Sequence, residues 1–296
     1  MNKKIIPYLA AFGTVLLWSS AFPAVRYTLV YFSPEGLMSF RFIIAAIVLI
    51  IYVIVKKIPF PKTKDLPFFL LSSFMGLFVY MWAFNTGSVH VVSGVSGFII
   101  ASSPVFTLIL SIIFLKEKAG FKCWLGVILS FCGIIIIAIS QVTDLELNIG
   151  IWLLVLAAVS TSVFNITQKK ILKSYTTIEA TAYTIIFGAA QMLIFAPNII
   201  TEAPAASVSS IFVVVYLGIF PAALAYFLWN FALKRTEKTV HVTSVLYLSP
   251  FLASLIAFIW LGEVIPALAF VGGIIVIIGM VITNISRNKK EELGET

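Results

Sequence analysis

Polar side chains recur along one face of an otherwise apolar stretch, and this spacing could let the chain bind a solute. Thr161, Asn165 and Gln168 fall at i, i+4 and i+7, which places them on one side of a helix. If that helix crosses a membrane, these groups must point inward, because an unpaired amide in lipid costs several kcal/mol. Hydrogen bonds between packed helices would also satisfy them. We favour a binding role for Asn165, which lies nearest the middle of the stretch.

Aromatic side chains lie in the same kind of stretch. Trp18, Trp82 and Trp229 are placed deep inside apolar runs, whereas the tryptophans typical of membrane interfaces lie close to predicted helix ends: Trp124, Trp152 and Trp260. A cavity made of aromatic rings would accept apolar side chains and, at the ring faces, an ammonium group. The predicted substrate-binding residues are Trp18, Trp82, Asn85, Asn165, Tyr226, Trp229 and Tyr247.

Two arginines stand apart from the other basic residues. Arg41 lies about two turns inside a predicted helix, where a charge needs a partner. It could be the counter-ion of a substrate carboxylate, or a structural tie to backbone carbonyls or to Glu35. Arg26, at the end of the first apolar stretch, could anchor that helix at the lipid headgroups or act as a gate.

All twelve acidic residues fall in predicted loops, in the tail or near helix ends. No carboxylate is therefore predicted near mid-membrane, where it could alternate between a proton and a cationic substrate. This disfavours cation/proton antiport and favours a neutral or zwitterionic solute. The two histidines, His90 and His241, are predicted near the membrane surfaces.

One motif points to an enzyme. Gly94-Val95-Ser96-Gly97 is a G-x-S-G of the kind found around the nucleophile of intramembrane serine proteases, but a serine needs a base within hydrogen-bond reach. His241 is predicted at the opposite side of the membrane, and His90 lies just before the same helix. Cys123 and Cys132 have neither disulfide nor metal-ligand spacing. We predict no enzyme, no metal and no cofactor; a channel-like pore is a further alternative, although no ring of like charges is visible.

The elements that must position these residues are membrane-spanning helices. Of 296 residues, 61% are apolar and only 11% are charged, against roughly a quarter charged in a soluble domain, so a water-soluble fold is excluded. A spanning helix takes about 20 residues. Stretches of that kind fall at residues 5–25, 34–55, 66–87, 92–115, 119–140, 149–170, 177–200, 208–233, 239–262 and 264–285. We predict an all-α integral membrane protein with ten transmembrane helices.

The net charge of +8 reflects membrane topology and not nucleic-acid binding. If the N-terminus is cytoplasmic, every lysine and arginine except Arg26 and Arg41 falls on the cytoplasmic side, and the opposite side holds acids only. The positive-inside rule then predicts a multi-pass protein of the cell membrane with both termini in the cytoplasm.

The two halves of the chain are similar to each other. A shift of 146 residues places Ser103-Pro104 on Ser249-Pro250 and Glu117 on Glu263. Because each half holds five spans, the second must cross the membrane in the opposite sense, as in inverted-repeat transporters. We predict repeats at 1–143 and 144–286 around a central cavity, a cytoplasmic tail at 287–296, and hinges at the proline kinks Pro104 and Pro250.

Three motifs occupy particular spans: Trp18-Ser19-Ser20-Ala21-Phe22 in the first, Arg41-Phe42 in the second, and Ser-Pro followed by Leu-x-Glu in the fourth and ninth. This set resembles the drug/metabolite transporter superfamily, specifically its EamA-type ten-helix exporters. The resemblance implies an alternating-access carrier whose spans 1, 3, 4, 6, 8 and 9 line the cavity, with spans 5 and 10 as scaffold. Span 2 is peripheral in that family, which favours the structural tie for Arg41.

We therefore predict a transporter that exports or equilibrates small metabolites. Amino acids or similar zwitterions are the first choice, because an aromatic, amide-lined cavity near an arginine suits them. The expected partners are a small-molecule substrate and the lipid bilayer, with no nucleic acid. The expected assembly is a monomer or a weak homodimer.

Overall fold

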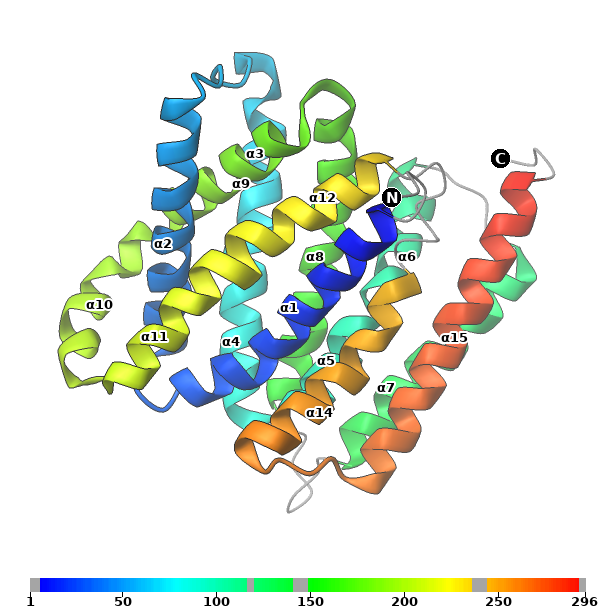
Figure 1. Cartoon of the computed structure of the whole chain (residues 1–296). Helices are drawn as coiled ribbons and strands as arrows, with labels where there is room; N and C mark the ends of the chain where they lie inside the picture. Colours follow the sequence, from blue (N-terminus) through cyan, green and yellow to red (C-terminus); the bar gives the residue numbers. More distant parts are fainter. Residues whose placement is uncertain (1–5, 116–119, 141–148, 236–243, 293–296) are drawn as a thin grey trace.

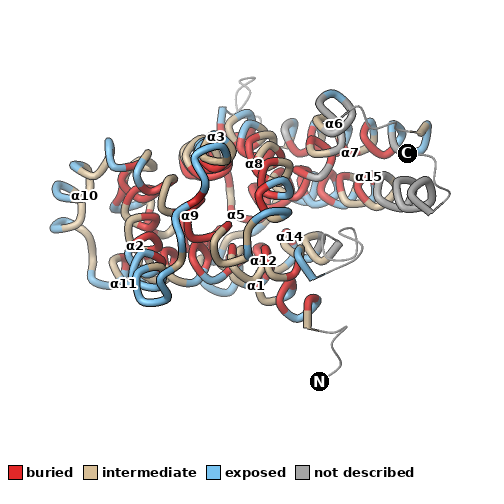
Figure 2. The backbone as a smooth tube through the Cα atoms, turned by 90° about the horizontal axis from the view of Figure 1, so that it is seen from above, coloured by how far each residue is buried: buried red, intermediate tan, exposed pale blue. Residues whose placement is uncertain are grey.

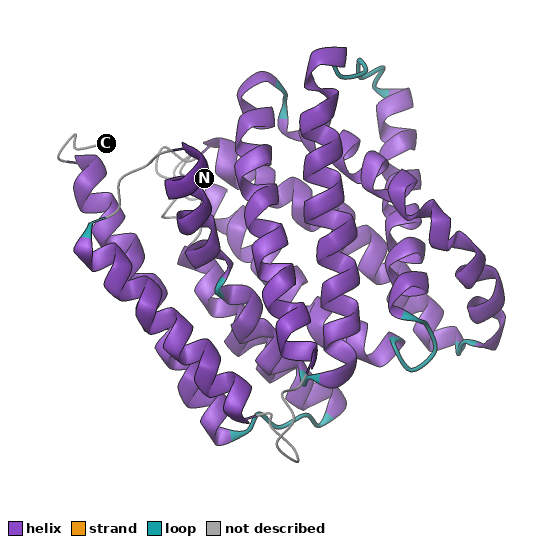
Figure 3. Cartoon of the chain, turned by 180° about the vertical axis from the view of Figure 1, so that it is seen from behind, coloured by secondary structure: helices purple, strands orange, loops and turns teal. Residues whose placement is uncertain are grey.

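The computed structural model describes residues 6–115, 120–140, 149–235 and 244–292, and the regular elements in these ranges are all helical (Figure 3). Six of the described helical segments are long and apolar enough to cross a membrane, and four shorter apolar helices lie at the remaining predicted spans. The predicted all-α membrane architecture is confirmed.

The first half of the chain supplies spans 1 to 5. Spans 1, 2 and 5 are single helices: α1 (Ile6–Thr28), α2 (Pro34–Val55) and α7 (Phe121–Ser140). Spans 3 and 4 are composite: η1 (Thr63–Asp65), α3 (Leu66–Ser73), the π-helical segment η2 (Phe74–Val79) and α4 (Tyr80–His90), then α5 (Ser93–Ala101) and α6 (Ser103–Leu115).

The second half supplies spans 6 to 10. Span 6 is the single helix α8 (Ile149–Ser174). Span 7 consists of α9 (Thr177–Met192), η3 (Leu193–Phe195), α10 (Ala196–Glu202) and η4 (Ala203–Ala205). Span 8 consists of α11 (Val208–Leu217), the π-helical segment η5 (Gly218–Leu224) and α12 (Ala225–Arg235). Spans 9 and 10 are η6 (Ser244–Leu248) with α14 (Ser249–Leu261), and α15 (Ala267–Glu292).

Several helix ends follow directly from local sequence. Ser33 caps α2 by accepting a hydrogen bond from the Gly36 N–H, and Pro34 occupies the first turn, where its missing N–H costs nothing. Thr176 and Glu179 form a reciprocal capping box at the start of α9. Gly262 ends α14 with a φ of 68°, a left-handed conformation that glycine adopts without strain.

The same irregularities occur at matching places in both halves. The π segments η2 and η5 interrupt spans 3 and 8, and the fourth and ninth spans are each broken just before a Ser-Pro pair. Pro104 and Pro250 therefore lie in the first turn of α6 and α14, a position that tolerates proline, and not inside an unbroken helix. The predicted interruptions are present, while hinge motion at them stays a prediction.

Packing interlocks the two halves. The first span, α1, packs against α12 and α14 of the second half (Figure 1). Its counterpart α8 packs against α4 and α6 of the first half. This exchange is what a pseudo-two-fold axis between inverted halves requires, and each half supplies neighbours that the other lacks.

Helices α7 and α15 form a pair at one edge of the molecule (Figure 1). A Cβ atom added to Gly133 would lie 2.6 Å from the Gly272 carbonyl oxygen, and one added to Gly272 would lie 2.8 Å from that of Gly133. Between them the Ser130 hydroxyl donates to the carbonyl of Val276, its counterpart under the 146-residue shift, at 3.3 Å. The counterparts of the two glycines under the same shift make the same contact, since a Cβ added to Gly279 would lie 2.5 Å from the Gly126 carbonyl oxygen.

The outer surface of the bundle is apolar, as a lipid environment requires. Large exposed side chains include Ile54, Phe212 and Ile259, each about 70% exposed. Buried residues face the middle of the bundle and exposed ones its outside (Figure 2). In the absence of water the segments associate through close packing and hydrogen bonds, because lipid is as apolar as the side chains.

Candidate functional site

A cavity lies at the centre of the bundle, between the two halves. Its volume is about 870 Å³ when the space open to the outside is counted. All spans that the family resemblance placed around a cavity contribute, α7 and α15 contribute nothing among the described residues, and span 2 adds Arg41. The principal side chains are those of Trp18, Phe22, Arg41, Tyr80, Met81, Phe84, Ser103, Thr161, Phe164, Asn165, Tyr226, Trp229 and Ser249.

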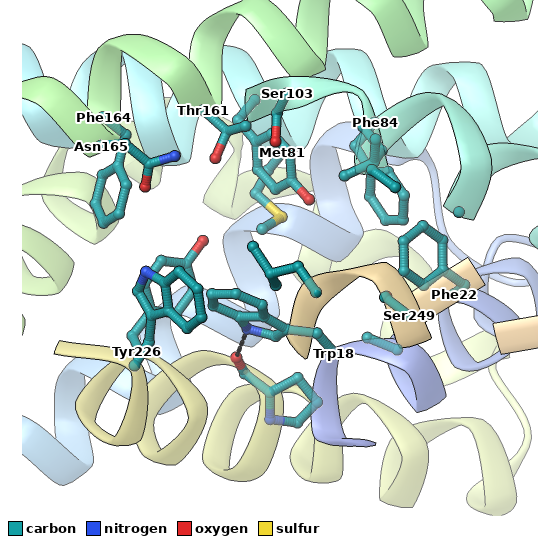
Figure 4. Close-up of a pocket in the computed structure, with 18 of the residues that line it drawn as sticks. Trp18, Phe22, Met81, Phe84, Ser103, Thr161, Phe164, Asn165, Tyr226 and Ser249 are labelled. Carbon is teal, nitrogen blue, oxygen red and sulfur yellow. Dashed lines mark hydrogen bonds between the residues drawn. The ribbon is translucent and has the colours of Figure 1, made fainter. Parts of the chain in front are cut away.

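Aromatic rings form one wall of this cavity. The ring of Trp18 lies with its centroid 5.4 Å from that of Tyr226 and 5.4 Å from that of Trp229. The Trp18 indole N–H donates to the Pro221 carbonyl in η5 at 3.1 Å (Figure 4). Because that N–H is used, Trp18 offers the cavity ring surface and not a hydrogen-bond donor.

Polar groups face this wall from α8 and α6. Figure 4 shows Thr161, Asn165 and Ser103 across the cavity from Trp18 and Tyr226. The neighbouring Ser162 hydroxyl ties α8 to the Ser103 carbonyl at 2.8 Å, which fixes the start of α6. None of the described hydrogen bonds uses the Thr161 hydroxyl or the Asn165 amide, so both are available to a solute.

Arg41 also lines the cavity, although the peripheral position of span 2 in the family favours a structural tie for it. The described contacts include none between Arg41 and Glu35, and the Glu35 carboxylate accepts the Trp82 indole N–H at 3.0 Å. The Arg41 side chain is 2% exposed, and its Nε has no hydrogen-bond partner among the described residues. Gly218 of η5 lets α2 come this close, since a Cβ there would lie 2.7 Å from the Arg41 carbonyl oxygen.

Four of the seven predicted substrate-binding residues line the cavity: Trp18, Asn165, Tyr226 and Trp229. Trp82 and Asn85 do not. They face the start of α2, where Asn85 donates to the Pro34 carbonyl at 3.0 Å and Trp82 binds Glu35. The cavity face of α4 carries Tyr80, Met81 and Phe84 instead. Tyr247 lies in η6, but its side chain is outside the described residues.

Other polar residues of the spans join helices. The Gln168 carbonyl oxygen accepts from Ser72 at 3.1 Å and from Thr184 at 3.4 Å. Asn230 on α12 donates to Thr181 at 2.8 Å. Gln168 and Asn230 therefore act as interhelical ties, the role weighed against solute binding for this kind of residue.

Arg26 is tied down at one end of the bundle. Its Nε lies 2.6 Å from a Glu263 oxygen, and its guanidinium donates to the carbonyls of Ser88 and Val91. The second Glu263 oxygen accepts the Ser93 N–H at 2.8 Å. This network joins α1, the α4–α5 connection and the α14–α15 connection, on the far side of Phe22 and Phe84 from Trp18.

The protease alternative gains no support. Ser96 is buried and its hydroxyl donates to the carbonyl of Val92, the residue before α5, at 3.3 Å. His241 lies outside the described residues, as do the side chains of Cys123 and Pro104. Among the residues described, no group of three His, Cys, Asp or Glu could hold a metal ion.

Comparison with known proteins decides the family. The model of the EamA-like transporter family matches residues 5–139 and again residues 148–285. The chain belongs to this family. The double match agrees with the internal repeat, and together with the apolar helices it makes this EamA-like protein a multi-pass membrane transporter.

Relatives are similar over nearly their whole length. The uncharacterized transporter YdfC of Bacillus subtilis is 32% identical over 99% of this chain and 96% of its own. A probable terminal-alkyne amino-acid exporter of Streptantibioticus cattleyicolor is 33% identical over 92% of this chain and 91% of its own. A solved crystal structure shares the fold, with a TM-score of 0.67, 19% identity and coverage of 96% and 98% of the two chains.

Proposed function

We propose that this EamA-like transporter carries amino acids or similar zwitterions through the central cavity by alternating access. The observation that carries the proposal is the composition of the cavity: an aromatic wall, an unused amide and hydroxyl opposite it, and one arginine with no acid among the described lining residues. The relative described as a probable amino-acid exporter supports the same solute class.

An uptake screen in proteoliposomes tests this proposal. Radiolabelled amino acids, nucleobases, sugars and amines would be offered separately, and saturation measured for every solute that enters. We expect saturable uptake of at least one amino acid with an apolar side chain. Uptake that rises linearly with concentration would instead indicate a channel, and uptake restricted to sugars or nucleobases would contradict the proposed solute class.

We further propose that transport does not require a proton gradient. Each acid whose side chain the structure describes lies near a helix end or in a connection, and none lines the cavity. Counterflow of a labelled amino acid should therefore proceed in vesicles without any imposed gradient. Exchange that occurs only across a pH gradient would refute this and direct attention to His90 and His241.

The proposed orientation in the cell membrane has both termini in the cytoplasm and the Arg26–Glu263 end outside. The test replaces Glu202 or Lys170 by cysteine in a background without Cys123 and Cys132, and applies an impermeant maleimide to intact cells. The Glu202→Cys protein should be labelled and the Lys170→Cys protein should not. The opposite pattern would reverse the orientation.

A further inference from the structure

Arg41 is a buried cation that has no counter-ion among the described residues. Every acid whose side chain the structure describes has another partner: Glu35 binds Trp82, Asp65 binds Tyr175, Glu179 binds Thr176, Glu202 binds the Ser33 N–H and Glu263 binds Arg26. No described hydrogen bond is made by the Arg41 side chain. A charge so far from water is unfavourable unless an anion joins it.

Because of its position, Arg41 can be reached by an anion that enters the cavity. The side chain lines the same cavity as Trp18, Asn165 and Tyr226, and it is the single charged side chain among the described lining residues. The packing of α2 on η5 at Gly218 holds its backbone in place. The neighbouring cavity residues Tyr80 and Tyr226 are neutral phenols that can donate hydrogen bonds to an anion but cannot neutralise the arginine.

We infer that Arg41 binds the carboxylate of the solute and thereby sets its specificity. A guanidinium can donate two parallel hydrogen bonds to a carboxylate, a geometry that an amide or an amine cannot reproduce. The ammonium group and side chain then lie toward the Trp18–Tyr226–Trp229 wall and the Asn165 amide. This inference rests on the proposed function and adds that the carboxylate end of the solute is recognised, and that Arg41 binds it.

Solutes that differ in one group test this assignment. Unlabelled leucine, leucinamide, 3-methylbutylamine and 4-methylpentanoate would each compete with labelled leucine for binding to the purified protein. The same series would be repeated with labelled 4-methylpentanoate. We expect leucine to bind about tenfold or more tightly than leucinamide and the amine, because only leucine brings a carboxylate to Arg41. The carboxylate without the ammonium group should still compete.

Substitutions at Arg41 connect this preference to the residue. Arg41→Gln should reduce the preference for leucine over leucinamide to within about twofold, while Arg41→Lys should retain part of it, because a lysine keeps the charge but loses the bidentate geometry. Arg235→Gln is the matched control, since Arg235 is exposed at the end of α12 and stacks on Phe231. The control should leave the preference unchanged.

Thermal stability separates solute binding from a structural role. If Arg41 has no partner in the empty protein, Arg41→Met should leave the melting temperature unchanged or raise it. A fall of more than about 5 °C would reveal a structural tie and overturn the inference.

Binding outcomes distinguish this inference from the proposed function. Equal binding of leucine and leucinamide, or an unchanged preference in Arg41→Gln, would overturn the role of Arg41 and leave amino-acid transport standing. Binding of 4-methylpentanoate but not of leucine, lost in Arg41→Gln, would support Arg41 and contradict the proposed solute class. Binding of none of the four probes would overturn both.

Discussion

Trp18 combines two roles in one side chain. Its indole N–H holds η5 through the Pro221 carbonyl, while its ring forms the cavity wall with Tyr226 and Trp229. Asn165 has no such second role among the described contacts, because its amide faces the cavity unbonded. The two residues therefore test the cavity from opposite sides.

Trp18→Ala and Asn165→Ala should each lower transport about tenfold or more while the protein stays folded and monodisperse, because they remove surface that a solute contacts. Trp152→Ala is the matched control, since Trp152 is 55% exposed on the outside of α8. Vesicle uptake and size-exclusion chromatography provide the two measurements. Normal transport by both cavity variants would mean that the solute passes elsewhere.

Part of the site could be predicted from residue types alone. Trp18, Asn165, Tyr226 and Trp229 are large or polar groups deep in apolar spans, and the structure brings all four to the cavity. Trp82 and Asn85 satisfy the same criterion, but their polar atoms are satisfied by the start of α2, which only tertiary packing reveals.

The spacing of Arg41 and Glu35 in the sequence argues against an ion pair between them. Residues six apart on a helix are separated by roughly 240° around its axis, so Glu35 and Arg41 were already on different faces. The peripheral position of span 2 in the family, by contrast, favours a structural tie for Arg41. The close approach at Gly218, which takes Arg41 into the cavity, cannot be read from sequence spacing.

At the scale of elements, we predict that motion is accommodated at the broken spans. The Ser19 hydroxyl lies 3.2 Å from the carbonyl oxygen of Ser249, at the start of α14, and the Ser162 hydroxyl makes the matching contact with Ser103. Each break is thus held by the long helix beside it. The positions of these breaks can be predicted from the Ser-Pro pairs. Of the two π segments, η5 is marked in the sequence by Pro221, whereas η2 contains no proline.

Pro250→Ala should slow exchange several-fold while equilibrium binding survives, because an uninterrupted helix across η6 and α14 would stiffen the element that must move. Pro266→Ala, in the exposed connection before α15, is the control. Counterflow rates and competition binding are compared in the same preparation. Equal exchange rates in the two variants would make the Pro250 break a static feature.

Substitutions in the α7–α15 pair should lower the stability of the protein before they affect transport. At Gly133 even a Cβ would lie 2.6 Å from the Gly272 oxygen, and at Gly279 it would lie 2.5 Å from the Gly126 oxygen, so Gly133→Leu and Gly279→Leu each place a large side chain where there is no room. Each should cost roughly 1–3 kcal/mol of stability through overpacking. We expect a lower melting temperature and lower expression before any change in affinity. A loss of affinity at unchanged stability would place this pair in the transport pathway.

At the scale of the whole molecule, we predict that the Arg26–Glu263 network closes one end of the route to the cavity. Glu263→Gln should raise, about threefold or more, the rate at which an impermeant maleimide applied at that end labels a cysteine placed at Ser249. The charge swap Arg26→Glu with Glu263→Arg should restore slow labelling if the ion pair itself provides closure. Unchanged labelling in Glu263→Gln would make Arg26 an anchor.

The interlocked packing of the halves has a consequence for how the protein is made. When α1 leaves the ribosome, its partners α12 and α14 lie about 200 residues or more downstream and have not yet been synthesised. Synthesis proceeds at about 5–20 residues per second, so Trp18 and the rest of its buried face wait many seconds in the translocon or in lipid before they are covered. The first half should accordingly be a client of membrane chaperones and a target of quality-control proteases until the ninth span arrives.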